Sequence, residues 1–316
     1  PDSYVEMKDV VIASNVITSH EHYVDRENTR LRILAPTIRP NEQLIVNVTF
    51  FSLKYKVEYS RPLLYGAGYP VEYTVYTQPE EYIESSDPLI VSKAQALMGA
   101  RVDTFRIAQR MYDFVISYLS YARQSETRGA LWALQNGKGD CTEFGTLFVA
   151  LLRAVGIPAR TVSGFVSRGF SVPPPPPLGA VSSAAHLWAE FYVDGIGWLP
   201  VDPTFGRSTP QDHFAILWSR YLPFLKGPSM KSPEHSLISL KYTGSYLNYT
   251  SQLFVTPLEI SSFTGQTIIN LFQADNLTDT MRQVADRAYS YDFNITDSYS
   301  TCLLYTSPSP RDRQKS

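Results

Sequence analysis

Cys141, His186 and Asp202 are the residues of this 316-residue sequence whose types and order suit nucleophilic attack on a carbonyl group. A cysteine thiolate is a strong nucleophile, and an imidazole can take up and return a proton near neutral pH. A carboxylate beside the imidazole can fix its tautomer and stabilise its charged form. Whether the three side chains can meet depends on the helix and the strands that the surrounding sequence predicts.

The segment around Cys141 predicts that this cysteine is the first residue of a helix. Asp140 is a favoured N-cap, and Glu143 stands three residues later, as in a capping box. The positive end of the helix dipole favours the thiolate, whereas the carboxylates of Asp140 and Glu143 oppose it. Gly156 and Pro158 end the predicted helix. Its apolar stripe consists of Phe144, Leu147, Phe148, Leu151, Leu152 and Val155.

Two glycines precede this helix in the segment NGKGDC. Gly137 and Gly139 would let a substrate backbone come close and free amide groups point at a developing oxyanion. The alternative is a capped helix that begins with a buried cysteine, the commonest environment of a single cysteine. A metal site is disfavoured, because no second Cys or His lies at the usual ligand spacing.

A hairpin predicted from AAHLWAEFYVDGIGWLPVDPT carries the histidine and the aspartate. Alternate residues from Leu187 onward are apolar, which places His186 on the opposite face of its strand, where it is not a core filler.

The length of the turn decides whether Asp202 can reach His186. A three-residue turn, Asp194 to Ile196, would set Asp202 opposite Trp188, diagonal to His186 and on the same face. A two-residue turn would put the carboxylate on the other face. We predict the three-residue turn, with the strain absorbed at Gly195 or by a bulge.

Composition and periodicity divide the chain into four parts. They are a β-rich N-terminal module (1–80), a core that carries Cys141, His186 and Asp202 (81–206), a mixed β and α C-terminal region (207–300) and a tail (301–316). In the core, an amphipathic helix within 100–121, the helix after Cys141 and three short strands favour an α+β fold. The C-terminal region predicts strands at 237–249 and 251–260 and a helix at 278–289. The tail is predicted to be disordered, and it resembles translated vector sequence foreign to the gene.

Three separated motifs resemble the transglutaminase-like core of the papain-like cysteine enzyme superfamily, in its prokaryotic or archaeal type. They are GKGDC (137–141), R-A-x-G-I-P-A-R (153–160) and H-x-W-x-E followed by G-W-x-P-x-D-P-T (186–204). The resemblance covers roughly residues 80 to 206. It implies a papain/transglutaminase-like α+β fold, in which the nucleophile helix packs on an antiparallel sheet. No segment resembles an organised calcium site, so the resemblance does not carry calcium dependence to this chain.

By position, the resemblance implies that Cys141 is the nucleophile, His186 the general acid and base, and Asp202 the residue that orients His186. The Cys141 amide would contribute to an oxyanion hole. Gln135, six residues upstream, is a candidate second donor as in papain-like proteases, although a polar loop residue is the blander alternative. Trp188 is expected to wall the cleft.

Three further features leave alternatives open. Trp132 is a cleft wall or a core residue, and Glu190 is a surface, strand-pair or functional residue. The insert 167–185 holds five consecutive prolines (173–177) just before His186, and it forms a rim, a lid or a stiff spacer.

Composition excludes several classes of function. The net charge of -2 gives no overall attraction to nucleic acid, and two cysteines cannot build a disulfide framework. No apolar run of about 18 residues spans a membrane in this fragment, although missing termini leave room for an anchor. Four Asn-x-Thr sites, at Asn47, Asn248, Asn276 and Asn294, lead us to expect an extracytoplasmic location.

These observations lead us to expect an enzyme without a cofactor that acts on a protein or peptide. We predict thiol-dependent acyl transfer or hydrolysis at a carboxamide or peptide carbonyl, most consistent with a transglutaminase-like cysteine peptidase or amidase. The alternatives are a transglutaminase that crosslinks protein glutamines, and a non-catalytic cell-surface scaffold that retains the fold.

Overall fold

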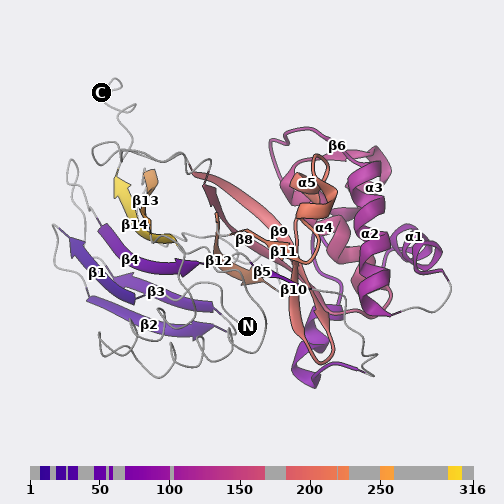
Figure 1. Cartoon of the computed structure of the whole chain (residues 1–316), viewed down its shortest axis with the longest axis horizontal. Helices are drawn as coiled ribbons and strands as arrows, with labels where there is room; N and C mark the ends of the chain where they lie inside the picture. Colours follow the sequence, from indigo (N-terminus) through magenta and orange to yellow (C-terminus); the bar gives the residue numbers. More distant parts are fainter. Residues whose placement is uncertain are drawn as a thin grey trace.

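The computed structural model of the chain describes residues 8–14, 19–25, 28–34, 46–54, 57–59, 68–99, 103–167, 183–218, 220–227, 250–259 and 298–307. Helices gather at one end of the molecule, an outer sheet lies at the other end, and a second sheet lies between them (Figure 1). Within the described part of the chain, no helix has the length and apolar character needed to cross a membrane.

The middle sheet is antiparallel and has the strand order β10-β9-β8-β12. Its strands are β8 (Ala159–Ser167), β9 (Ser183–Val193), β10 (Gly197–Val201) and β12 (Tyr221–Gly227). The three core strands predicted from alternation are therefore confirmed. The fourth, β12, was not predicted, because its sequence YLPFLKG has little alternation and a proline inside it.

In the described part of the chain, five α-helices form a layer on one face of this sheet. They are α1 (Pro88–Met98), α2 (Thr104–Tyr118), α3 (Ala130–Asn136), α4 (Cys141–Ala154) and α5 (Pro203–Gly206). Of these, α2, α4 and α5 contact the sheet directly. Asp87 caps α1 and Asp103 caps α2, each through a side-chain oxygen that accepts from a backbone N–H of the first turn. The mixed α+β core, with helices packed on an antiparallel sheet, is confirmed.

The helix α4 lies in the middle of this layer, where it contacts β9 and the helices α1, α2 and α3. It is buried on nearly all sides, which explains why its sequence is apolar beyond one stripe. Gly145 allows the close approach to β9, because a Cβ there would lie 2.3 Å from Leu187 Cδ2. The main apolar core, which includes Phe144, Phe148 and Phe191, fills the space between helices and sheet.

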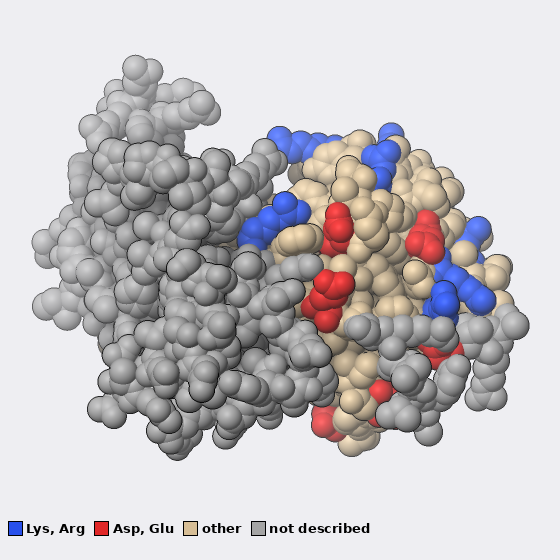
Figure 2. Space-filling view, in the orientation of Figure 1, with Lys and Arg blue, Asp and Glu red and all other residues tan. Residues whose placement is uncertain are grey.

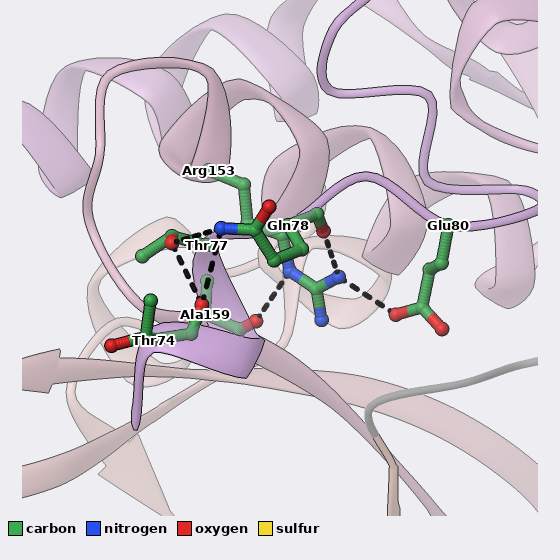
Figure 3. A network of polar contacts seen from close by, with 6 residues as sticks. All are labelled: Thr74, Thr77, Gln78, Glu80, Arg153 and Ala159. Carbon is green, nitrogen blue, oxygen red and sulfur yellow. Dashed lines mark hydrogen bonds and ion pairs between the residues drawn. The ribbon is translucent and has the colours of Figure 1, made fainter. Parts of the chain in front are cut away.

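A buried arginine ties the segment before α1 to the core (Figure 3). Arg153 donates from Nη1 to the Gln78 carbonyl oxygen at 2.8 Å and to Glu80 Oε1 at 2.7 Å. Its Nε donates to the Ala159 carbonyl oxygen at 2.8 Å. These contacts hold the end of a 3-10 helix, η1 (Val71–Thr77), against α4 and β8. The core fold therefore begins before residue 81, where the sequence predicted its boundary.

The outer sheet joins segments from both ends of the chain in the order β1-β4-β14-β13. Its strands are β1 (Lys8–Ser14), β4 (Val46–Lys54), β14 (Ser298–Ser307) and β13 (Thr250–Glu259). β2 (Ser19–Asp25) and β3 (Asn28–Leu34) form a separate hairpin. The predicted strand at 251–260 is thus present as β13, but it shares one sheet with β1 and β4 of the β-rich N-terminal module rather than lying in a separate C-terminal part.

Residues 301–307, predicted to be disordered, instead belong to β14. This strand pairs with β13 on one side and β4 on the other, so its backbone groups are satisfied by both neighbours. The segment TCLLYT is rich in β-branched and apolar residues, which suit a strand. The predicted strand at 237–249, the predicted helix at 278–289 and the end of the tail lie outside the described residues, as does the insert between 168 and 182.

Short elements connect the outer part of the molecule to the core. β5 (Val57–Glu58) pairs with β11 (Ile216–Leu217), and the Asn28 side chain exchanges two hydrogen bonds with the Lys226 backbone in β12. β11, β12 and a 3-10 turn, η2 (Pro210–Asp212), all follow residue 206. The boundary predicted at 206 therefore cuts through the sheet that carries the candidate site.

Candidate active site

Cys141 occupies the first position of α4, as the capping pattern predicted. The Thr142 N–H donates to Asp140 Oδ1 at 3.0 Å, and the Asp140 N–H donates to Glu143 Oε2 at 3.0 Å, which completes the capping box. Cys141 is a free thiol of intermediate exposure. It is therefore not the fully buried cysteine of the alternative interpretation.

The remaining oxygens of the two capping carboxylates hold a neighbouring loop. Asp140 Oδ2 accepts from the Gln124 N–H at 3.1 Å, and Glu143 Oε1 accepts from the Arg128 N–H at 2.9 Å. The carboxyl group of Glu143 is fully buried, and this burial raises its pKa despite the two backbone donors. A raised pKa reduces the negative charge that Glu143 places near Cys141.

The two glycines before Cys141 have structural explanations. A Cβ at Gly139 would lie 2.2 Å from the Cβ of Glu143, so the space beside Gly139 is filled by the capping residue and not left for a substrate. Gly137 ends α3 in the left-handed conformation, with φ 64°. The short parallel pair β6 (Ser120–Tyr121) and β7 (Lys138–Gly139) joins this segment to the end of α2.

The predicted turn between β9 and β10 is confirmed. Val193 pairs with Gly197, and regular pairing continues to Val201 opposite Ala189. Gly195 absorbs the turn with φ +75°. This register brings Asp202 to the side of β9 on which His186 lies.

His186 and Asp202 are in direct contact in the structure. His186 Nε2 lies 2.7 Å from Asp202 Oδ2, and both residues are buried, with exposed fractions of 8% and 1%. Cys141 lies near enough to His186 to contribute to the raised pKa of the imidazole. Since Nε2 faces the carboxylate, Nδ1 is the ring nitrogen left for the thiol. The structure thus brings the three predicted residues together in the order Cys141, His186, Asp202.

Asp202 is held by four donors. It caps α5, because its Oδ1 accepts from the backbone N–H groups of Thr204 at 2.9 Å and Phe205 at 3.1 Å. Its Oδ2 accepts from His186 and from the Tyr221 hydroxyl, which lies 2.6 Å away. One carboxylate therefore ends the hairpin, starts the next helix and orients the imidazole.

The charges of this pair follow from its contacts. Burial disfavours the imidazolium, but the Asp202 carboxylate and then Cys141 outweigh it and raise the pKa of His186 to about 10. Burial likewise opposes ionisation of Asp202, but His186, Tyr221 and the Phe205 N–H outweigh it and lower the pKa of the carboxyl group. At neutral pH the pair is an imidazolium beside a carboxylate.

Three residues of the site were not predicted from sequence. The Tyr221 hydroxyl contacts Asp202, the His213 Nδ1 lies 3.4 Å from that hydroxyl, and the Phe205 ring lies 4.7 Å from the His186 ring. Phe205 stands three residues after Asp202, directly after the matched D-P-T motif, and could have been noticed there. Tyr221 and His213 come from β12 and the segment before it, and no sequence pattern marked them.

Trp188 and Glu190 differ from their expected environments. Trp188 is fully buried, and its ring packs against the rings of Tyr221 and His186. It therefore supports the imidazole from the interior and does not line an open cleft. Glu190 is a strand-pair residue, as one alternative proposed, but it is buried. Its carboxylate lies 2.7 Å from Arg160 Nη2, and Arg160 stacks 3.9 Å from the Trp198 ring.

The structure gives the positions of the other two candidates, Gln135 and Trp132, and shows no hydrogen bond from either of them to Cys141 among the described residues. Gln135 is an exposed residue near the end of α3, and its role as an oxyanion donor stays a prediction. Trp132 is half-buried on the same helix, with the Arg128 guanidinium 5.9 Å from its ring centre. Among the described residues, no group of three or more His, Cys, Asp and Glu side chains could hold a metal ion.

Comparisons with known proteins bear on this site. A family model described as the transglutaminase-like superfamily matches residues 92–203. A protein-glutamine gamma-glutamyltransferase from Pseudomonas aeruginosa is 39% identical over 67 residues, which cover 21% of this chain and 10% of that protein. An uncharacterized protein from Haemophilus influenzae is 42% identical over 76 residues, which cover 21% of each. The chain thus spans well under two thirds of the length of these relatives.

A solved structure shows a weaker likeness. The crystal structure of a candidate cysteine protease from Cytophaga hutchinsonii is 17% identical, covers 72% of each chain and has a TM-score of 0.49.

Proposed function

Residues 92–203 of this chain form a transglutaminase-like superfamily domain, and on this premise we propose that the protein is a cysteine enzyme acting on carboxamide or peptide carbonyl groups. The observation that carries the proposal is the contact between His186 Nε2 and Asp202 Oδ2 at 2.7 Å, with Cys141 near enough to the same imidazole to raise its pKa. Cys141 is the nucleophile, His186 the general acid and base, and Asp202 the residue that orients the imidazole.

The reaction begins from a thiolate and imidazolium pair. The Cys141 sulfur attacks the carbonyl carbon, and the negative charge moves to the carbonyl oxygen, for which the backbone amide of Cys141 at the start of α4 is the proposed donor. Because the sulfur then no longer carries charge, its contribution to the raised pKa of His186 is lost, and the imidazolium becomes a stronger acid. His186 gives its proton to the leaving nitrogen, the C–N bond breaks, and a thioester remains on Cys141.

The acceptor of the thioester separates two functions. We propose hydrolysis, in which neutral His186 takes a proton from water as the water attacks the thioester carbonyl. The C–S bond then breaks, the acid product leaves, and the Cys141 thiolate and His186 imidazolium are restored, so that the protein is a peptidase or amidase. The second candidate is transfer to a primary amine, which crosslinks protein glutamines. Its support is the similarity over 67 residues to a protein-glutamine gamma-glutamyltransferase.

We further propose that the substrate is a protein or peptide and that the enzyme works outside the cytoplasm. Lys, Arg, Asp and Glu side chains are interspersed over the described part of the face in Figure 2, without a gathered basic patch there. This arrangement supports a peptide substrate over a polyanion. The extracytoplasmic location is proposed from the four Asn-x-Thr sites. Of these, Asn47 lies in β4, and the other three lie outside the described residues.

A glutamine peptide incubated with and without a fluorescent primary amine tests the proposal. Release of ammonia or cleavage without amine incorporation indicates a hydrolase, and incorporation indicates a transferase. The Cys141→Ala variant, checked for folding by circular dichroism, must abolish either product.

Selective alkylation separates an enzyme from a scaffold that retains the fold. Iodoacetamide at pH 6 should modify Cys141 much faster than Cys302, as measured by mass spectrometry of the peptides. Equal rates at the two cysteines, together with no product from a panel of amide substrates, would refute the enzymatic proposal.

A further inference from the structure

One oxygen of Asp202 is shared between the imidazole and a tyrosine. Asp202 Oδ2 lies 2.7 Å from His186 Nε2 and 2.6 Å from the Tyr221 hydroxyl oxygen. The other oxygen, Oδ1, is already occupied by two backbone N–H groups of α5. The α5 amides therefore already hold the Asp202 carboxylate in position without Tyr221. The hydrogen bond from the Tyr221 hydroxyl must have another effect than holding Asp202 in place.

Tyr221 can act toward Asp202 only as a donor. Its side chain is 2% exposed, and its ring packs edge-on against Trp188 at 5.2 Å. Burial and the Asp202 charge raise the pKa of the hydroxyl far above its ordinary value, against the smaller opposite effect of Arg220. Because the hydroxyl keeps its proton across the working pH range, it donates that proton to the carboxylate.

A second imidazole completes the surroundings of Tyr221. His213 Nδ1 lies 3.4 Å from the Tyr221 hydroxyl oxygen, and His213 is 3% exposed. Burial lowers the pKa of His213, and the nearby Arg220 acts in the same direction against Asp202 and Asp212. His213 is thus neutral at pH 7. Since the Tyr221 hydroxyl gives its proton to Asp202, the contact with His213 is a hydrogen bond when Nδ1 carries the ring proton. A neutral ring supports this hydroxyl without adding a charge to the pair.

The shared oxygen has a consequence for the acid strength of His186. The Tyr221 hydroxyl oxygen lies 2.6 Å from Oδ2, and the proton it donates takes up part of the electron density that Oδ2 would otherwise direct at the imidazolium. An undivided carboxylate would bind the Nε2 proton more strongly and make the imidazolium a weaker acid. A general acid works best when its pKa lies near the working pH, so weakening this hold favours proton donation.

We propose that Tyr221 is a positioning residue that shares Asp202 Oδ2 with His186 and so limits how strongly Asp202 holds the imidazolium. The proposal deepens the proposed function and rests on it for the catalytic consequence. The shared hydrogen bonds themselves can be tested without any substrate.

The experiment compares the wild-type protein with Tyr221→Phe and with Tyr112→Phe. Tyr112 is a matched control, since it is a buried tyrosine whose hydroxyl donates to the Pro210 carbonyl oxygen at 2.8 Å and not to Asp202. Proton NMR at pH 7 observes the His186 Nε2–H resonance directly. We expect it to move downfield in Tyr221→Phe, because the hydrogen bond to Asp202 strengthens, and to stay in place in Tyr112→Phe.

Kinetics supply the second readout. Loss of one buried hydrogen bond should lower kcat of Tyr221→Phe by about 3- to 10-fold, with KM unchanged and the alkaline limb of the pH profile moved upward. An unchanged or upfield Nε2–H resonance in Tyr221→Phe would overturn the inference even if the enzyme is active. A downfield shift in a protein that turns over no amide substrate would support the shared oxygen and refute only the proposed function.

Discussion

Replacing Asp202 by asparagine removes one charge from the site and changes little of its shape. The asparagine carbonyl can still accept from the two backbone N–H groups of α5. Its amide group would then face His186 Nε2 and donate to it. The imidazole would therefore carry its own proton on Nδ1, toward Cys141, in the tautomer that cannot accept the thiol proton.

The expected magnitude follows from the charge. Asp202 and Cys141 hold the pKa of His186 at about 10 against burial, so without the carboxylate the burial that remains should bring it to or below its ordinary value of 6.5. A difference of this size corresponds to roughly 5 kcal/mol in the stability of the imidazolium. We expect kcat/KM of Asp202→Asn to fall by about 10³- to 10⁴-fold.

Alkylation of Cys141 measures the loss without a substrate. Iodoacetamide labelling between pH 5 and pH 9, followed by mass spectrometry, should show at pH 6 a loss of about 10²-fold or more in the rate at Cys141. Cys302 serves as the reference thiol, and Asp194→Asn, the same change in the β9–β10 turn, serves as the control variant. Alkylation of folded Asp202→Asn within about threefold of the wild-type rate at pH 6 would refute the reasoning.

Three further predictions concern charge and packing. Because the pKa of His186 is raised to about 10, the folded state keeps a proton that the unfolded chain loses above pH 6.5. The free energy of unfolding, measured by urea titration, should therefore fall between pH 6.5 and about 10 by up to ~1.4 kcal/mol per pH unit. A free energy of unfolding that does not change over this pH range would contradict the prediction. Gly145→Ala places a methyl group 2.3 Å from a side chain of β9 and should lower the free energy of unfolding by about 1–3 kcal/mol. The control Gly68→Ala meets nothing within 4 Å and should leave the urea midpoint unchanged. Arg160→Met or Glu190→Leu removes one partner of a buried ion pair and should each cost about 3–5 kcal/mol, with the double variant less destabilised than the sum; additive losses would show that the pair does not interact.

The local parts of the site could be predicted because local rules determine them. The N-cap at Asp140 with Glu143 three residues on specifies where α4 begins, so Cys141 falls at its first position. A three-residue turn specifies the register of the following strand, and the period of two then decides the face on which Asp202 lies. Both rules act over a few residues, and the structure confirms both.

Long-range packing decided what the local rules could not. The spacing of Gly137 and Gly139 suggested room for a substrate, but Glu143 fills that space at Gly139. Alternation placed Trp188 on the side away from the core, but β12 and a second apolar cluster bury that side as well. A strand face is exposed only if no other element covers it, and alternation alone does not say which element does so.

The sequence by itself determined the order of nucleophile, base and carboxylate and the elements that carry them, because caps, turns and strand period are local. Only the tertiary structure decided that β12 lies beside β8 and brings Tyr221 to Asp202, since that pairing joins residues distant in the chain. It also decided that strands from both ends of the chain form one sheet. Such contacts depend on which surfaces can be buried together, and this is a property of the whole fold.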